Sequence, residues 1–184
     1  MAGLWRGYVR LAQVYPFRTQ VGTTGVLFLV GDAIAQFGVE RRTFQNYDYA
    51  RTARMSAVGL LWVGPVLRTW LVTLERLVVS TGPTAALKKM CLDQTLMAPF
   101  FLGTFYPVVG LSRWDSWEDI KQLVKKEYLS TLLNNYKIWP AVQLANFYFV
   151  PLNLRLLVMN IVALGWNTYL SWRANIHTED SSTS

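Results

Sequence analysis

The chain has 184 residues, of which 52% are hydrophobic and only 16% are charged, whereas a soluble domain averages about a quarter charged residues. Its single cysteine, Cys91, and single histidine, His177, exclude an internal disulfide, a cysteine-built metal site and a histidine-based triad, zinc site or haem. The formal net charge of +7 comes from basic residues dispersed at the ends of apolar runs, which favours anionic lipid head groups over nucleic acid as the partner.

Residues 1–16 predict an amphipathic helix that lies in the membrane interface. Aromatic and small residues recur there at helical spacing, at Trp5, Tyr8, Ala12 and Tyr15. Arg6 and Arg10 lie off this face, as expected of an interfacial helix. No acidic residue precedes Asp32, which is typical of a mitochondrial targeting sequence, here expected to remain uncleaved. A plain basic membrane flank is an equal alternative.

The first predicted membrane span covers residues 17–38, close to the length of roughly 20 residues that a bilayer requires. Gly31 and Ala35 form a pair of small residues that permits close approach of another helix. Asp32 and Gln36 lie one turn apart in the same span. Because an unpaired carboxylate within a membrane is costly, Asp32 is a functional candidate unless it reaches the head groups from the end of the span.

The second predicted span, residues 53–73, follows a polar loop at 39–52. Its Val63-Gly64-Pro65 sequence predicts a kink at the proline. Arg68 lies one turn beyond that kink, where its charge requires an anion or water.

The third predicted span, residues 90–111, carries Asp93 near its start. Two lysines precede Asp93 by about one turn and are expected to satisfy its carboxylate at the interface. Asp32 is then the better partner for Arg68, and we predict an ion pair between them. Cys91 lies among apolar neighbours, so we expect it to be buried and not to act as a redox centre.

Residues 115–128 have the pattern of a second interfacial helix, in which Asp115 and Glu118 have the spacing of an N-terminal cap. The fourth predicted span, residues 131–151, follows directly. The expected fold is therefore an all-α integral membrane bundle with four transmembrane helices and additional amphipathic interfacial helices.

Residues 152–172 are apolar and long enough to cross the membrane, so hydropathy alone would allow a fifth crossing. We expect this segment to lie against the bundle without crossing, which places both termini on the same side. Residues 173–184 are polar and are expected to form a disordered tail.

The stretch W-P-A-V-Q-L-A-N-F-Y-F-V-P within and after the fourth span combines apolar character with two amides and two prolines. Gln143 and Asn146 lie three residues apart, on one helical face. Amides that faced lipid would remain unsatisfied, so they should face another helix, backbone or a hydrated cavity. Holding helices together and lining a pore both fit this pattern.

This stretch closely resembles the signature of a family of small multi-pass organelle proteins that includes Mpv-seventeen and the twenty-two-kilodalton peroxisomal membrane protein. The matching residues here are Trp139, Pro140, Gln143, Asn146, Phe147, Val150, Pro151 and Arg155. The resemblance extends to Gly31-Asp32, Val63-Gly64-Pro65, Asp93-Gln94 and the segment from Trp166 to Trp172, and so covers nearly the whole chain. It implies a four-helix protein of the mitochondrial inner membrane that acts as a channel and is needed to maintain mitochondrial DNA.

The expected function is a channel or solute pathway that affects the membrane potential and supports mitochondrial homeostasis and mitochondrial DNA, with deoxynucleotide supply as one route. The candidate pore or polar network consists of Asp32, Arg68, Asp93, Gln143, Asn146 and Arg155. The alternatives are a non-conducting structural or assembly protein of the inner membrane and a peroxisomal membrane channel. No phosphate-cradling glycine loop, nucleophile motif or metal ligand set is recognisable, so we expect neither an enzyme nor a cofactor. Expected partners are membrane lipids, small solutes or ions and a second copy of the chain in a homo-oligomer, with no direct binding of nucleic acid.

Overall fold

The computed structural model describes residues 2–79, 82–149 and 152–175, with side chains described throughout these ranges except at residues 2, 4, 5, 146–149 and 152–160. The elements, in chain order, are α1 (Ala2–Val14), α2 (Pro16–Ile34), η1 (Ala35–Val39), η2 (Phe44–Asn46), α3 (Tyr49–Val58), η3 (Gly59–Val63), α4 (Gly64–Leu77), α5 (Pro83–Leu92), η4 (Asp93–Met97), α6 (Ala98–Ser112), α7 (Trp117–Phe149) and α8 (Leu152–Asn175). No strand occurs in these described ranges, and the predicted all-α class is confirmed.

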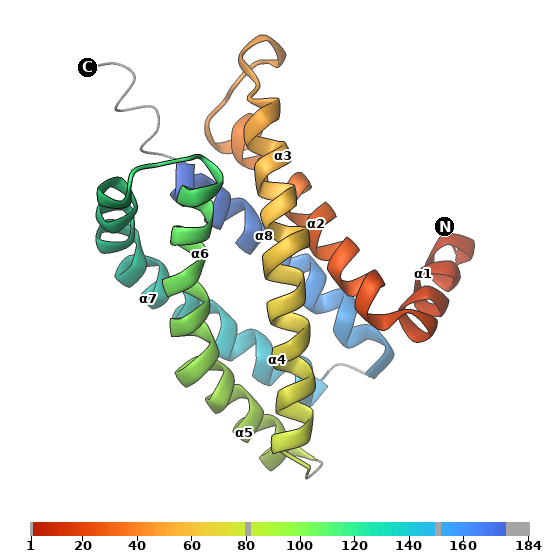
Figure 1. The fold of residues 1–184 in the computed structure, drawn as a ribbon. Coiled ribbons are helices and arrows are strands. Elements are labelled where there is room, and N and C mark those ends of the chain that lie inside the picture. Colours follow the sequence, from red (N-terminus) through yellow and green to blue (C-terminus); the bar gives the residue numbers. More distant parts are fainter. Residues whose placement is uncertain (1, 80–81, 150–151, 176–184) are drawn as a thin grey trace.

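The helices form a bundle in which the chain runs repeatedly between two ends (Figure 1). α2 runs from the end near α1 to the opposite end, and the continuous helix α3–η3–α4 returns. α5–η4–α6 then runs back, α7 descends obliquely along it, and α8 follows α2. α1 forms a V with the beginning of α2, and the Tyr8 hydroxyl lies 3.3 Å from that of Thr23.

Three helical segments are long and apolar enough to cross a membrane among the residues that the structure describes: Pro16–Val39, Tyr49–Leu77 and Pro83–Ser112. They contain the predicted spans at 17–38, 53–73 and 90–111. The fourth predicted span, 131–151, lies in α7 and ends beyond the described part of that helix. The count of four crossings therefore remains a prediction.

α7 differs from the expected pair of a short interfacial helix and a separate span. Trp117–Phe149 is one helix of 33 residues, roughly 50 Å long at 1.5 Å per residue. Pro140 lies inside this helix, which continues through it. The cap is also displaced by one residue from the predicted Asp115, because the Ser116 hydroxyl accepts a hydrogen bond from the Asp119 N–H at 3.2 Å and donates one to the Asp119 carboxylate at 2.6 Å.

α8 is a continuous helix of 24 residues that packs along α2. Near its end, Ser171 donates a hydrogen bond to Asp32 at the far end of α2. Asn175 therefore lies at the opposite end of the bundle from Pro16, where α2 begins (Figure 1). α8 therefore runs along the length of α2, while the number of crossings and the sides of the two termini remain predictions.

Two prolines within the spanning helices each follow a π-helical turn by two residues. η3 ends at Val63, directly before Gly64-Pro65, and η4 ends at Met97, directly before Ala98-Pro99. A proline ring inside a helix clashes with the carbonyl four residues earlier and leaves it without its usual N–H donor. The wider π turn accommodates that carbonyl, so both helices continue past their prolines.

Glycine allows α2 to approach its neighbours closely. A Cβ added at Gly31 would lie 3.0 Å from both the Asn167 Cβ and the Thr168 backbone nitrogen of α8, and one at Gly25 would lie 3.2 Å from Leu60 Cβ of η3. The small-residue face predicted at Gly31 thus forms the α2–α8 contact. Gly22, by contrast, has nothing within 4 Å of such an added atom.

The apolar core lies where α2, α3, α6, α7 and α8 meet. Its members are Phe28, Met55, Val58, Val63, Leu102, Phe105, Tyr106, Val109, Leu123, Trp166, Leu170 and Ala174. The single cysteine is not part of it: Cys91 is exposed on α5, so the expectation that it is buried was wrong.

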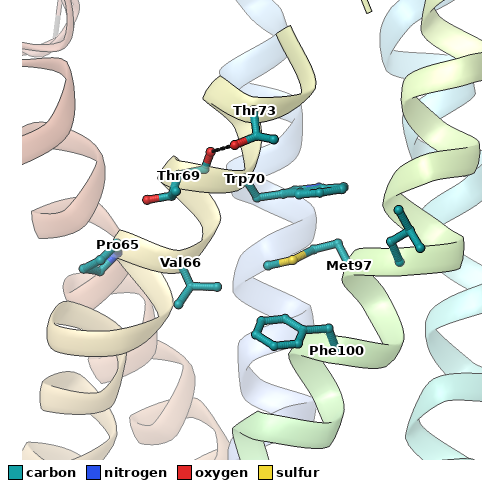
Figure 2. A pocket seen from close by; sticks show the side chains of 8 residues that line it. Pro65, Val66, Thr69, Trp70, Thr73, Met97 and Phe100 are labelled. Atoms are coloured by element: carbon teal, nitrogen blue, oxygen red, sulfur yellow. Dashed lines mark hydrogen bonds between the residues drawn. The ribbon is translucent and has the colours of Figure 1, made fainter. Parts of the chain in front are cut away.

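An open groove separates α4 from the η4–α6 segment (Figure 2). Its volume is about 520 Å³. Its lining residues are Pro65, Val66, Thr69, Trp70, Thr73, Leu96, Met97 and Phe100.

Candidate functional site: a buried charged cluster

The Asp32 carboxylate is fully buried, 0% exposed, near the C-terminal end of α2. Its Oδ1 accepts hydrogen bonds from Arg51 Nε at 2.8 Å and from the Ser171 hydroxyl. Its Oδ2 accepts from Thr52 Oγ1 at 2.5 Å and from Gln36 Nε2 at 2.8 Å. A carboxylate with four donors, one of them a guanidinium, can remain buried as an anion.

Arg51 bridges two acids from the first turn of α3, where its side chain is 4% exposed. Besides Asp32, its guanidinium binds Glu40 through two parallel hydrogen bonds, Nη1 to Oε2 at 2.9 Å and Nη2 to Oε1 at 2.7 Å. This is the strong bidentate geometry of an arginine and a carboxylate. Arg42 Nε donates a further hydrogen bond to Glu40 at 2.9 Å, so two basic side chains neutralise two acidic ones.

Gln36 ties the connection between α2 and α3 to this site. Its Oε1 accepts the Asp48 backbone N–H at 2.8 Å, and its Nε2 donates to the Asp48 carbonyl at 3.1 Å. Asp48 in turn caps α3 by accepting the Arg51 N–H at 2.8 Å. Tyr47 adds a 2.6 Å hydrogen bond between its hydroxyl and that of Thr52.

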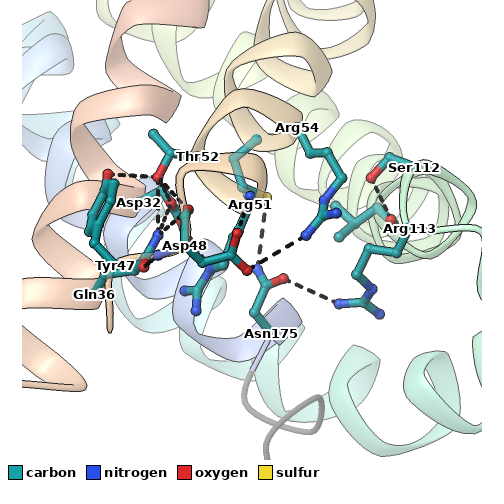
Figure 3. A network of polar contacts seen from close by, with 12 residues as sticks. Asp32, Gln36, Tyr47, Asp48, Arg51, Thr52, Arg54, Ser112, Arg113 and Asn175 are labelled. Atoms are coloured by element: carbon teal, nitrogen blue, oxygen red, sulfur yellow. Dashed lines mark hydrogen bonds and ion pairs between the residues drawn. The ribbon is translucent and has the colours of Figure 1, made fainter. Parts of the chain in front are cut away.

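We call the interacting side chains of Asp32, Gln36, Glu40, Arg51, Thr52 and Ser171 the Asp32 cluster. Figure 3 labels four of them, Asp32, Gln36, Arg51 and Thr52. It joins α2, η1, α3 and α8 at one end of the bundle. Removing one member of a buried ion pair typically costs about 3–5 kcal/mol, because the other charge remains buried. The cluster therefore holds these elements together only while both signs of charge are present.

The end of α8 is also bound to the turn after α6 (Figure 3). Arg113 Nη1 donates to the Ala174 carbonyl at 2.6 Å, while its Nη2 lies 2.5 Å from Asp115 Oδ2. Asn175 Nδ2 donates to the Ser171 carbonyl at 2.8 Å. A cation at the C-terminal carbonyls of a helix is stabilising, so this contact fixes α8 beside the Asp32 cluster.

Arg68 does not pair with Asp32, and the ion pair predicted from the sequence was wrong. Arg51 and Arg68 belong to the continuous helix Tyr49–Leu77 and are about 17 residues, or roughly 25 Å, apart along it. Asp32 binds the arginine at the beginning of that helix. The sequence reading placed residues 39–52 in a loop outside the membrane and so overlooked Arg51.

Asp93 is satisfied by side chains other than the two preceding lysines. Its Oδ1 accepts from the Trp70 indole N–H at 2.8 Å, and its Oδ2 accepts from Gln94 Nε2 at 2.9 Å. Lys89 Nζ instead pairs with Glu75 at 2.6 Å. The expected lysine contact was therefore wrong, and Asp93 belongs to a second polar site between α4 and η4.

Gln94 connects that second site to α7. Asn135 Nδ2 donates to Gln94 Oε1 at 2.8 Å, and the Tyr136 hydroxyl donates to the Gln94 carbonyl at 3.0 Å. These amides hold helices together, which is the role that polar residues most often have in membrane bundles.

The motif on α7 is only partly described. Gln143 is buried at 9% exposure, and its Oε1 accepts no hydrogen bond from the residues that the structure describes. Trp139 packs edge-on against Trp166 of α8, with ring centroids 6.2 Å apart. The side chains of Asn146, Phe147, Pro151 and Arg155 lie outside the described residues.

Sequence reasoning found Asp32 and the neighbouring Gln36 but missed the other four members of the cluster, Glu40, Arg51, Thr52 and Ser171. Glu40 and Arg51 lie on either side of a short connection between two apolar helices. Opposite charges at such a junction are a usable signal, because the connection brings the two helix ends together. Ser171, 139 positions from Asp32 in the chain, carried no comparable signal.

The cluster offers mutually bound charges, hydroxyls and amides. Among the residues that the structure describes, no group of three or more His, Cys, Asp or Glu side chains could hold a metal ion. What the arrangement does is hold the buried carboxylate of α2 against the guanidinium of α3, with the Ser171 hydroxyl of α8 as a further donor.

Residues 110–171 match the model of the Mpv17 / PMP22 family. The chain is similar to proteins named mitochondrial inner membrane protein Mpv17: it is 46% identical to that of Xenopus laevis, over 95% of this chain and 99% of the relative. It is 47% identical to that of Homo sapiens, over 94% and 98%, and 42% identical to the protein sym-1 of Neurospora crassa, over 85% and 91%. No solved structure matches the chain.

Proposed function

The chain belongs to the Mpv17 / PMP22 family, and from this premise we propose that it forms a gated pathway for small solutes or ions across the mitochondrial inner membrane. Its place in that membrane follows from two observations. Relatives named mitochondrial inner membrane protein Mpv17 are 46–47% identical to it over nearly their full length, and its helices are apolar enough to cross a bilayer. The peroxisomal alternative has no support among these relatives.

The observation that carries the proposal is the charged cluster buried inside apolar helices. Asp32 is 0% and Arg51 only 3% exposed. Ionisable groups within a membrane are expensive to bury, and they concentrate where a bundle becomes hydrated. In the proposed closed state, Arg51 is neutralised by Asp32 and Glu40. In the proposed open state, α8 separates from α2 and α3, and these charges line a path for water and solutes.

The formal net charge of +7 favours anions among the solutes. Passage of deoxynucleotides or other anionic metabolites would link the pathway to mitochondrial DNA, and passage of ions would link it to the membrane potential.

A non-conducting structural role is the second candidate. It is favoured by the completeness of the cluster, since each oxygen of Asp32 and Glu40 accepts a hydrogen bond. Because all four carboxylate oxygens are satisfied, the cluster can be explained by stability alone, without an open state.

Release of dyes from liposomes distinguishes the two candidates. Liposomes that contain the purified protein are loaded with an anionic dye or a cationic dye of similar size. A pathway predicts release above that of protein-free liposomes, faster for the anion, and faster still for Arg51→Gln. Arg54 is a matched control because its Nη2 lies 3.8 Å from Asp48 and both side chains are over a third exposed, so Arg54→Gln should behave as wild type. Release no faster than from protein-free liposomes, for wild type and Arg51→Gln alike, would support the structural role instead.

A further inference from the structure

The groove between α4 and η4–α6 lies between two helices that can both cross the membrane, Tyr49–Leu77 and Pro83–Ser112. Its volume of about 520 Å³ is in the range of sites that bind small molecules. In a bilayer the groove opens toward lipid, so its occupant must be compatible with an acyl-chain environment.

Two of the three polar side chains in the lining, Trp70 and Thr73, are already bonded within the protein. The Trp70 indole N–H donates to Asp93 at 2.8 Å, and the Thr73 hydroxyl donates to the Thr69 carbonyl at 2.9 Å. In Figure 2 the Thr69 hydroxyl points away from Met97 and Phe100. A polar ligand would lose its own hydration here without gaining partners, so the lining selects a hydrocarbon.

The remaining lining is apolar and adaptable. Trp70, Met97 and Phe100 are turned toward one another across the groove (Figure 2). Leu96 and Phe100 are 55% and 56% exposed, which leaves them accessible to a chain that lies along the groove. Methionine fits irregular apolar shapes because its side chain is flexible.

One end of the groove is basic. Thr69, Thr73 and Arg76 have the spacing i, i+4, i+7, so Arg76 continues the α4 wall beyond the groove. On the other wall, Lys88 lies about two turns before Leu96. Both basic residues are exposed, and neither pairs with an acid of the described chain. Lys89 is neutralised by Glu75, whose contact at 2.6 Å also fixes the two walls at this end.

We propose that this groove binds an acyl chain of an anionic phospholipid whose phosphate is held by Arg76 and Lys88. The apolar lining accepts the chain, and the two cations at its end select the head group. The site lies between α4 and α6 and contains no member of the Asp32 cluster. The proposal is therefore independent of whether the protein conducts solutes.

Photolabelling tests this site. The full chain is placed in phosphatidylcholine vesicles that contain a trace of phosphatidylglycerol with a photoreactive acyl chain, and labelled peptides are mapped by mass spectrometry. We expect the label to concentrate on the groove residues, and a phosphatidylcholine probe to label them several-fold less. Leu96→Trp should block labelling by filling the groove from an exposed position. Arg76→Gln with Lys88→Gln should abolish the preference for phosphatidylglycerol.

Matched controls keep the result specific. Leu61→Trp adds the same ring at a 75% exposed position outside the groove, and Arg18→Gln with Lys125→Gln removes the same charge elsewhere. Both should label as wild type. Labelling spread evenly over the lipid-facing helices, equal labelling by the two head groups, or crosslinks between two copies of the chain through groove residues would each overturn the proposal.

Discussion

Replacing Arg51 with glutamine removes the guanidinium that binds both Asp32 and Glu40. Glutamine is shorter and uncharged, so the two carboxylates would remain buried with a single neutralising partner, Arg42. Breaking a buried ion pair costs about 3–5 kcal/mol. Because whole proteins are stable by only about 5–15 kcal/mol, this loss should lower the thermal midpoint of the protein in detergent by many degrees.

The matched control for this change lies one turn later on the same helix. Arg54→Gln removes a contact of 3.8 Å between side chains that are 37% and 38% exposed. Exposed pairs contribute about 0–1 kcal/mol, so Arg54→Gln should leave the thermal midpoint nearly unchanged.

A double-mutant cycle separates the ion pair from general damage. Arg51→Gln and Asp32→Asn are each expected to destabilise, and the double variant should lose clearly less than the sum, since neither charge then remains unpaired. Strict additivity, or equal effects of Arg51→Gln and Arg54→Gln, would refute the claim that Arg51 neutralises Asp32.

The remaining predictions concern other parts of the bundle. Gly31→Ala should destabilise by about 1–3 kcal/mol in the same thermal assay, because the new methyl group would press on α8; Gly22→Ala, with open space around it, should be neutral or slightly stabilising, and equal effects would contradict the close α2–α8 contact. Arg68→Gln should cost far less than Arg51→Gln, since Arg68 has no acidic partner in the described chain; a comparable loss of thermal stability would revive its predicted pairing. Protease protection of terminal tags should place the two ends of the chain on opposite sides of the membrane, because α8 ends beside the end of α2; protection of both tags on one side would support four crossings.

The helical class and the positions of three spanning helices could be predicted because runs of apolar residues and their charged ends are local properties. The close contact at Gly31 was also predictable, since small residues on a spanning helix allow another helix to approach closely. The length of α7 was not, because the charged residues 115–128 and the apolar residues 131–151 suggested two elements, whereas one helix runs through both and through Pro140. Local signals alone do not reveal whether a neighbouring helix stabilises a proline within a helix.

The charged cluster could be predicted only in part. Asp32 was identified because burying a charged carboxylate in an apolar helix costs free energy. Its partner, however, depends on which cation the connection between α2 and α3 brings close. Arg51 lies at the end of a region that reads as an exposed loop, yet Gln36 and Asp48 fold that loop onto the helix ends. Ser171 reaches Asp32 from α8, a contact set by tertiary packing that no local pattern encodes.

The central claim is that separation of α8 from α2 opens a pathway, and a reversible crosslink between the two helices tests it most directly. A Cβ at Gly31 would lie 3.0 Å from the Asn167 Cβ, about half an ångström below the lower limit of the roughly 3.5–4.5 Å that disulfides span. Gly31→Cys with Asn167→Cys, in a Cys91→Ser background, is recorded in a planar bilayer before and after addition of a reductant, beside the variant that carries Gly31→Cys alone. The account predicts no conductance while the disulfide is closed, conductance after reduction, and no response to reductant in the single-cysteine variant. Conductance that is equal in the oxidised and reduced states, or silence in both while wild type is silent too, would contradict it.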